Sequence, residues 1–131
     1  MSFSNVGALM WITLHSFAEK IKPDAFTSNK AEILDFLREF YNNELPCDQC
    51  RIDSINYLDN YGTLSSQADL KKYLFDFHQS INKKLYKRVY DETILSQYES
   101  VNITSVFSLF NTKCRTESIK TFLTTHESWF N

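Results

Sequence analysis

Two cysteines three residues apart, Cys47 and Cys50, are the part of this sequence best suited to do chemistry. In a helix this spacing places both side chains on one face, one turn apart, where the two sulfurs can form a disulfide. Pro46 favours a helix start here, and the positive end of a helix favours a thiolate. Arg51 adds a positive charge next to the pair. Because a thiolate is the species that attacks a disulfide, the motif predicts a redox-active cysteine pair.

A C-x-x-C motif on its own also fits other kinds of site. It supplies half of a zinc site, but a tetrahedral site needs two further ligands, and the remaining candidates show no zinc-finger spacing. Two inert cysteines in a helical core have the same spacing. A thioredoxin-like motif requires a βαβ context, which this sequence does not offer. The remaining ligand candidates are Cys114, His15, His78 and His126.

The composition excludes several classes of protein. The chain has 131 residues, of which 43% are hydrophobic, enough for one globular domain with its own core. The net charge is −2 and the charges are interleaved, so nucleic acid is not an expected partner. We expect no membrane span and no signal peptide, because no apolar run is long enough and the N-terminus lacks a basic region. Three cysteines are too few for a disulfide-stapled secreted scaffold.

The elements that position the cysteine pair are predicted to be helices. Only two glycines and two prolines occur, which favours long helices over many short strands. Hydrophobic spacing predicts helices at about residues 5–21 and 47–58, a helix between a Ser28 cap and Pro46, and a long helix at 65–90. A short fifth helix at about 92–99 completes an all-α four-helix bundle. Residues 1–100 are therefore interpreted as one domain, followed by a helical extension at 101–131 whose last helix spans about 116–126.

Apolar residues three or four apart are predicted to form the core faces of these helices. Beside two of the faces lie histidines with a partner one turn away: Trp11 with His15, and His78 with Asn82. A single helical His is usually structural, but together with C-x-x-C these pairs indicate a pocket for a flat, hydrogen-bonding cofactor. The predicted core residues include Met10, Leu14, Phe17, Ile21, Leu37, Tyr41, Ile52, Ile55, Leu58, Leu70, Leu74, Phe77, Ile81 and Leu85.

In these same residues the chain resembles the Erv/ALR sulfhydryl oxidases, a family of FAD-dependent enzymes on a small helical bundle. The match covers about residues 6–98, and three blocks in the right order and spacing are specific where one alone is weak. Phe75 occupies the place of a structural cysteine found in many members, so the chain is most similar to the short forms of large cytoplasmic DNA viruses. The blocks are Gly7-x-x-x-Trp11-x-x-Leu14-His15-x-x-Ala18, Leu45-Pro46-Cys47-x-x-Cys50-Arg51 and Phe77-His78-x-x-Ile81-Asn82-x-x-Leu85-x-Lys87-x-x-Tyr90.

The resemblance implies an FAD-dependent thiol oxidase that forms disulfides in partner proteins. Cys47 would exchange with the partner thiol. Cys50 would pass the electron pair to FAD, and reduced FAD would give it to oxygen, forming hydrogen peroxide. Gln79 departs from the family pattern, which usually has Asn there. The resemblance implies no metal site. The FAD-binding residues that carry over are Trp11, His15, His78 and Asn82, with Gly7, Leu85 and Lys87 at flanking positions.

The resemblance also implies partners and a compartment. The expected substrate is a thiol-containing protein, such as a thioredoxin-like or C-x-x-C carrier, and the expected assembly is a homodimer through the first two helices. Phe26, Phe36 and Phe40 support the dimer, because they give the second helix more apolar surface than one core face needs. The expected location is cytoplasmic, at a viral assembly site or in the virion, with the mitochondrial intermembrane space as the alternative. The alternative function is a non-enzymatic helical interaction module with inert or zinc-binding cysteines.

Overall fold

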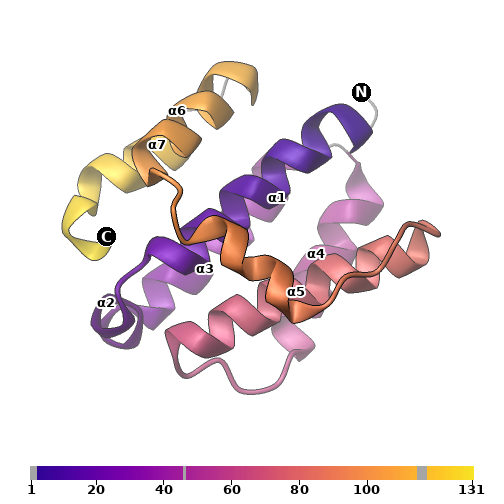
Figure 1. The fold of residues 1–131 in the computed structure, drawn as a ribbon, viewed down its shortest axis with the longest axis horizontal. Helices are drawn as coiled ribbons and strands as arrows, with labels where there is room; N and C mark the ends of the chain where they lie inside the picture. Colours follow the sequence, from indigo (N-terminus) through magenta and orange to yellow (C-terminus); the bar gives the residue numbers. More distant parts are fainter. Residues whose placement is uncertain (1–2, 46, 115–117) are drawn as a thin grey trace.

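A computed structural model of the chain describes residues 3–45, 47–114 and 118–131 (Figure 1), with the side chains of residues 7–45, 47–112 and 119–131. Apart from one isolated bridge between Ile21 and Phe130, the regular structure of this part of the chain is helical. The expected all-α architecture is confirmed. The elements are α1 (Phe3–Lys20), α2 (Pro23–Ser28), α3 (Lys30–Glu44), α4 (Asp48–Asn60), α5 (Gln67–Lys84), η1 (Glu92–Tyr98), α6 (Ile103–Cys114), α7 (Ser118–Thr125) and η2 (Glu127–Trp129).

Helix α1 lies at the centre of the fold. Figure 1 shows α5 on one side of it and the α6–α7 pair on the other, and α1 packs against both α5 and α6. Its predicted core residues are buried as expected. So are most of those predicted on α3 and α5. The buried apolar residues of these helices include Met10, Leu14, Phe17, Ile33, Leu37, Tyr41, Leu70, Leu74 and Phe77.

Two helix boundaries differ from the expectation. Pro23 begins the short helix α2, and Asn29, not Ser28, precedes α3 without a side-chain cap. The long helix starts after its Ser66 cap as predicted, but it ends at Lys84 instead of residue 90. Its end is set by Tyr86, which has a left-handed φ of 57° and lets the following amide bond back to the helix.

Two predicted core residues are wrong. Ile52 is 53% exposed, because α4 turns Ser54 and Leu58 inward instead. Leu85 is 48% exposed, because α5 ends before it. For Ile52 the apolar spacing indicated the wrong face of α4, and for Leu85 it continued beyond the end of α5.

The C-terminal extension packs onto the first helices. Its predicted last helix appears as α7, and a further helix, α6, precedes it within the extension. Phe17 of α1 lies against Phe107, with ring centroids 6.3 Å apart. The Lys22 amide donates to the Trp129 carbonyl over 2.7 Å. The division at residue 100 therefore stays a prediction, although both sides of it share a hydrophobic cluster.

The C-terminal helices also cover the apolar surface that favoured a dimer. The Phe36 and Phe122 rings stack with centroids 4.1 Å apart, and Phe40 lies 5.5 Å from Phe110. Phe26, Phe36 and Phe40 are all buried within the chain. That support for a homodimer is therefore wrong, and the dimer stays a prediction. None of the described helices combines the length and the apolar character needed to cross a membrane.

Candidate active site

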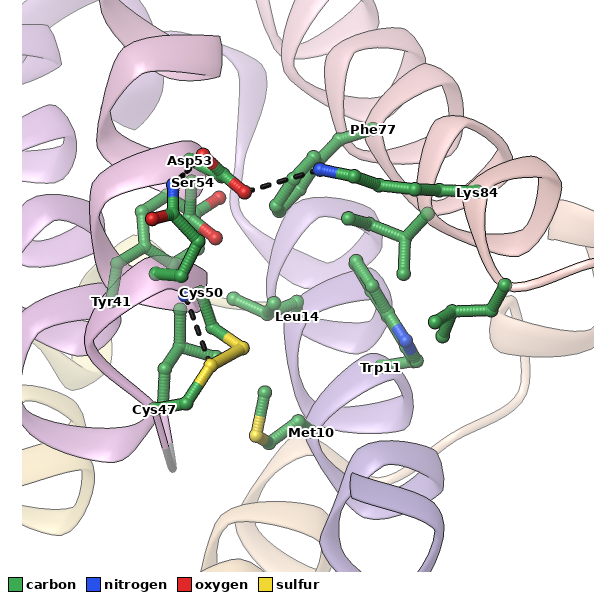
Figure 2. A pocket seen from close by; sticks show the side chains of 14 residues that line it. Met10, Trp11, Leu14, Tyr41, Cys47, Cys50, Asp53, Ser54, Phe77 and Lys84 are labelled. Atoms are coloured by element: carbon green, nitrogen blue, oxygen red, sulfur yellow. Dashed lines mark hydrogen bonds and ion pairs between the residues drawn. A yellow bond between two sulfur atoms is a disulfide. The ribbon is translucent and has the colours of Figure 1, made fainter. Parts of the chain in front are cut away.

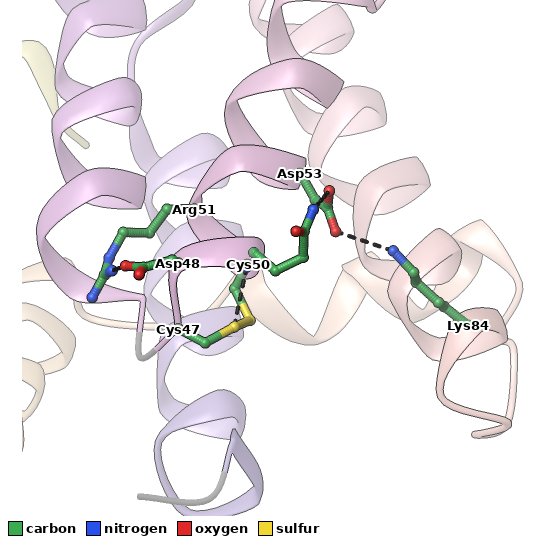
Figure 3. Close-up of a disulfide and its surroundings, with 7 residues drawn as sticks. Cys47, Asp48, Cys50, Arg51, Asp53 and Lys84 are labelled. Atoms are coloured by element: carbon green, nitrogen blue, oxygen red, sulfur yellow. Dashed lines mark hydrogen bonds and ion pairs between the residues drawn. A yellow bond between two sulfur atoms is a disulfide. The ribbon is translucent and has the colours of Figure 1, made fainter.

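Cys47 and Cys50 form a disulfide at the N-terminus of α4, with Cα atoms 5.2 Å apart (Figure 3). Cys47 is the N-cap residue, and its Sγ accepts a hydrogen bond from the Cys50 amide over 3.1 Å. The predicted cysteine pair at a helix start is thus present. The sulfurs sit where the unpaired amides of the helix favour negative charge.

The two sulfurs differ in their surroundings. Cys47 is exposed, whereas Cys50 is partly buried and packs against the hydrophobic core. Arg51, the expected neighbouring cation, forms an ion pair with Asp48. Its charge is therefore partly compensated, and the helix terminus remains the more direct source of thiolate stabilisation.

An apolar cavity of about 320 Å³ opens beside the disulfide (Figure 2). Met10, Trp11 and Leu14 of α1 form one wall, and Phe77 and Ile81 of α5 form another. Both cysteines line it. Its apolar lining suits a largely apolar ligand in contact with the sulfurs.

A second cavity, of about 380 Å³, lies beyond Trp11, which lines both cavities. This cavity is more polar and carries the side chains of Lys87 and Arg88. Arg88 lies over the Tyr90 ring, 4.9 Å from its centroid. Two cations at one cavity are suited to a phosphorylated ligand.

The histidines link the two helices behind Trp11. His78 stacks on Trp11, with ring centroids 4.0 Å apart and planes 9° from parallel. His15 Nε2 lies 2.9 Å from His78 Nδ1, so one ring donates a hydrogen bond to the other. Burial, with His78 nearby, lowers the pKa of His15 to about 3, and burial and Lys87 lower the pKa of His78 to about 4. Both rings are therefore uncharged near neutral pH.

The structure brings the sequence-predicted residues together. Gly7, Trp11, His78, Asn82 and Lys87 line the second cavity. Two further predicted residues lie nearby: Leu85 lines the apolar cavity, and buried His15 reaches the site through its hydrogen bond to His78. The side chain of Cys114 lies outside the described residues.

Sequence reasoning missed several residues of the site. Gln79, noted only as a departure from the family pattern, accepts a hydrogen bond from the Tyr90 amide over 2.7 Å and holds the segment after α5. Asp53 and Lys84 pair across the apolar cavity from α4 and α5. They are 31 residues apart, so no local pattern could have joined them. Among the residues that the structure describes, no group of three or more His, Cys, Asp or Glu could hold a metal ion.

Comparisons with known proteins agree on one family. The family model described as Erv1 / Alr family matches residues 8–103. The chain is 31% identical over 103 residues to the FAD-linked sulfhydryl oxidase of African swine fever virus, covering 71% of this chain and 86% of that protein. It is 30% identical over 87 residues to the mitochondrial FAD-linked sulfhydryl oxidase ERV1 of Saccharomyces cerevisiae, covering 66% of this chain and 46% of that protein.

Solved structures give the same result. The yeast Erv1 core superposes with a TM-score of 0.66 at 25% identity, covering 78% of this chain and 88% of that chain. The FAD-binding domain of yeast Erv1 gives a TM-score of 0.63 at 26% identity, covering 76% of this chain and 95% of that chain.

Proposed function

Because the chain belongs to the Erv1/Alr family and is an FAD-linked sulfhydryl oxidase, we propose that Cys47 and Cys50 are its redox pair. Cys47 is the sulfur that exchanges with the partner thiol, and Cys50 is the sulfur that faces FAD. The observation that carries this assignment is the difference in burial: Cys47 is exposed, and Cys50 packs inward beside the apolar cavity. Family membership sets aside the alternative of a non-enzymatic interaction module.

The cavities fit the two halves of FAD. The apolar cavity beside the disulfide suits the flavin ring, and the cavity with Lys87 and Arg88 suits the diphosphate and the adenosine. Asn82 and the neutral His78 offer hydrogen-bonding groups there without adding charge. FAD held there would supply a two-electron acceptor for the cysteine pair, with oxygen as the final electron acceptor and hydrogen peroxide as the product.

The cysteines perform the thiol chemistry. A partner thiolate attacks Cys47, a mixed disulfide forms, and Cys50 leaves as a thiolate that the helix N-terminus favours. A second partner thiol then releases Cys47, so the partner gains a disulfide and the pair becomes a dithiol. When the Cys47–Cys50 bond forms again, the pair gives up two electrons and two protons.

Two variants test the assignment of the sulfurs. Cys47→Ser leaves Cys50 as a free thiol beside the flavin, and a thiolate against oxidised flavin gives a long-wavelength absorption band. We expect that band in Cys47→Ser, growing as the pH rises through the thiol pKa. Cys50→Ser is expected to bind FAD without the band and to accumulate a stable mixed disulfide through Cys47.

The outcomes separate the possibilities. The band in Cys50→Ser instead of Cys47→Ser would mean that the two sulfurs have exchanged roles. Absence of the band from both variants at full FAD occupancy would mean that the pair does not contact the flavin. Both variants should lose oxidase turnover and keep the fold, because neither cysteine belongs to the buried centre of the bundle.

The substrate, assembly and location are further parts of the proposal. The substrate is a thiol-containing protein, and the exposed Cys47 favours a carrier that presents a mobile C-x-x-C or thioredoxin-like thiol pair. A cytoplasmic location, at a viral assembly site or in the virion, is supported by the viral relative, and the yeast relative supports the mitochondrial alternative. Capturing the partner as a mixed disulfide on Cys50→Ser identifies the substrate. The proposed assembly is a homodimer through α1 and α3, which are the first two helices that the sequence predicts.

A further inference from the structure

An ion pair crosses the solvent edge of the apolar cavity. Lys84 Nζ, in the last turn of α5, lies 3.1 Å from Asp53 Oδ2 in α4 (Figures 2 and 3). Gln49 donates a second hydrogen bond to Asp53 over 2.7 Å. Because Asp53 follows Cys50 by one helical turn, the pair lies close to the flavin-side sulfur.

These two side chains are the formal charges at this cavity. Of the described residues that line it, Lys84 is the cation and Asp53 the anion, and the remainder are uncharged. Hydrogen bonds from Gln49 and Lys84 lower the pKa of Asp53, so its carboxylate is ionised near neutral pH. The apolar wall screens charge less than water does, so each group acts on a ligand in the cavity, with part of the effect screened by solvent because the side chains of Lys84 and Asp53 are 64% and 34% exposed.

We propose, on the basis of the proposed function, that Lys84 raises the reduction potential of the bound FAD and that Asp53 partly offsets this increase. Oxidation of the Cys47–Cys50 dithiol releases two electrons and two protons. The electrons pass to FAD with one proton when the reduced flavin is held as an anion, and the second proton goes to solvent. A cation beside the ring stabilises that anion, and the paired carboxylate weakens the effect.

Other contacts hold α4 in place, so removing the ion pair should change the charge at the cavity without moving this helix. Arg38 of α3 binds Asp59 over 2.9 Å, and the Tyr61 hydroxyl donates to Asp76 of α5 over 2.6 Å. The Tyr57 ring also packs 5.0 Å from Phe77. Variants at Asp53 and Lys84 should therefore keep α4 packed against α5.

The test is the midpoint potential of FAD bound to the full chain, measured against a reference dye with protein in excess, so that no free FAD contributes to the signal. Lys84→Met should make reduction of the flavin less favourable by about three- to tenfold, and tenfold corresponds to about 30 mV for a two-electron couple. Asp53→Asn should shift the potential in the opposite direction, because it leaves the ammonium uncompensated. Lys84→Arg keeps the cation and should stay within about twofold of the wild type. Since the Lys84 side chain is 64% exposed, the shifts should shrink in concentrated salt.

The signs of the potential shifts distinguish an effect of charge from the loss of a bridge between the helices. A bridge that acts only by joining two helices is broken or weakened in both neutral variants, so shifts in the same direction would overturn the proposal. Equal potentials in all four proteins would also overturn it. A wild-type chain that binds no FAD would contradict the proposed function instead, which keeps the two failures distinguishable.

Discussion

Replacing Phe107 by Ala tests whether the C-terminal helices belong to the same cooperative unit as α1, α4 and α5, which contribute residues to the two cavities. Phe107 of α6 is 1% exposed, and its ring lies 6.3 Å from Phe17 and 6.1 Å from Phe130. Truncating a buried Phe to Ala costs roughly 3–5 kcal/mol through lost transfer free energy and the cavity left behind. The total stability of a domain is about 5–15 kcal/mol, so Phe107→Ala should lower the urea midpoint strongly.

The assay is equilibrium unfolding in urea, followed by circular dichroism and by release of flavin fluorescence. Leu109→Ala is the matched control, because Leu109 lies on the same helix and is largely exposed, so its loss should cost less than about 0.5 kcal/mol. A cost below about 1 kcal/mol for Phe107→Ala would refute the reasoning. Separate transitions for the two signals would show that residues 101–131 unfold as a unit of their own.

The remaining predictions concern pH, a helix end, the third cysteine and assembly. His15 and His78 have pKa values of about 3 and 4 in the folded chain, against about 6.5 when unfolded. The unfolded chain therefore binds protons first as the pH falls below about 6.5, so denaturation titrations should show the free energy of unfolding falling toward pH 4. The fall should be shallower in His15→Gln. Tyr86→Gly should raise the free energy of unfolding by about 1 kcal/mol, because glycine adopts the left-handed conformation without a Cβ clash; no gain in urea midpoint would contradict this. Cys114→Ala should keep turnover with a small dithiol, and loss of most activity would show that this thiol takes part. Sedimentation at micromolar concentration should give a dimer, and monomer alone would refute the homodimer.

The cysteine pair and the cavity-lining residues that we propose to bind FAD could be predicted because their signals are local. Cys47 and Cys50 lie within one turn, and Trp11 and His15 occupy one face of one helix. Placing that face against His78 then required only that two helices of a bundle pack together. The ordered blocks supplied that pairing, and the structure has His15 and His78 in hydrogen-bond contact.

The other features of the fold and the site depend on tertiary contacts that hydrophobic periodicity does not encode. Leu85 continues the apolar spacing of α5, but Tyr86 ends the helix in a conformation that favours glycine, so the sequence carried no stop signal there. The spacing of Phe36 and Phe40 predicts surface for a partner chain, because nothing in their own helix shows that Phe110 and Phe122 cover them. Asp53 and Lys84 meet only once α4 and α5 pack together.

The place of Trp11 between the two cavities gives the protein an internal optical probe. The chain has two tryptophans, and the second, Trp129, stacks on His126 near the C-terminus. In a Trp129→Phe chain the indole emission would come from Trp11 alone. Oxidised flavin absorbs where indole emits, so a flavin ring against Trp11 would quench this signal, whereas a nucleotide without flavin, such as ADP, would occupy only the cavity on the far side of the indole. Fluorescence titrations with FAD, riboflavin and ADP can therefore follow the occupation of each cavity without an added label.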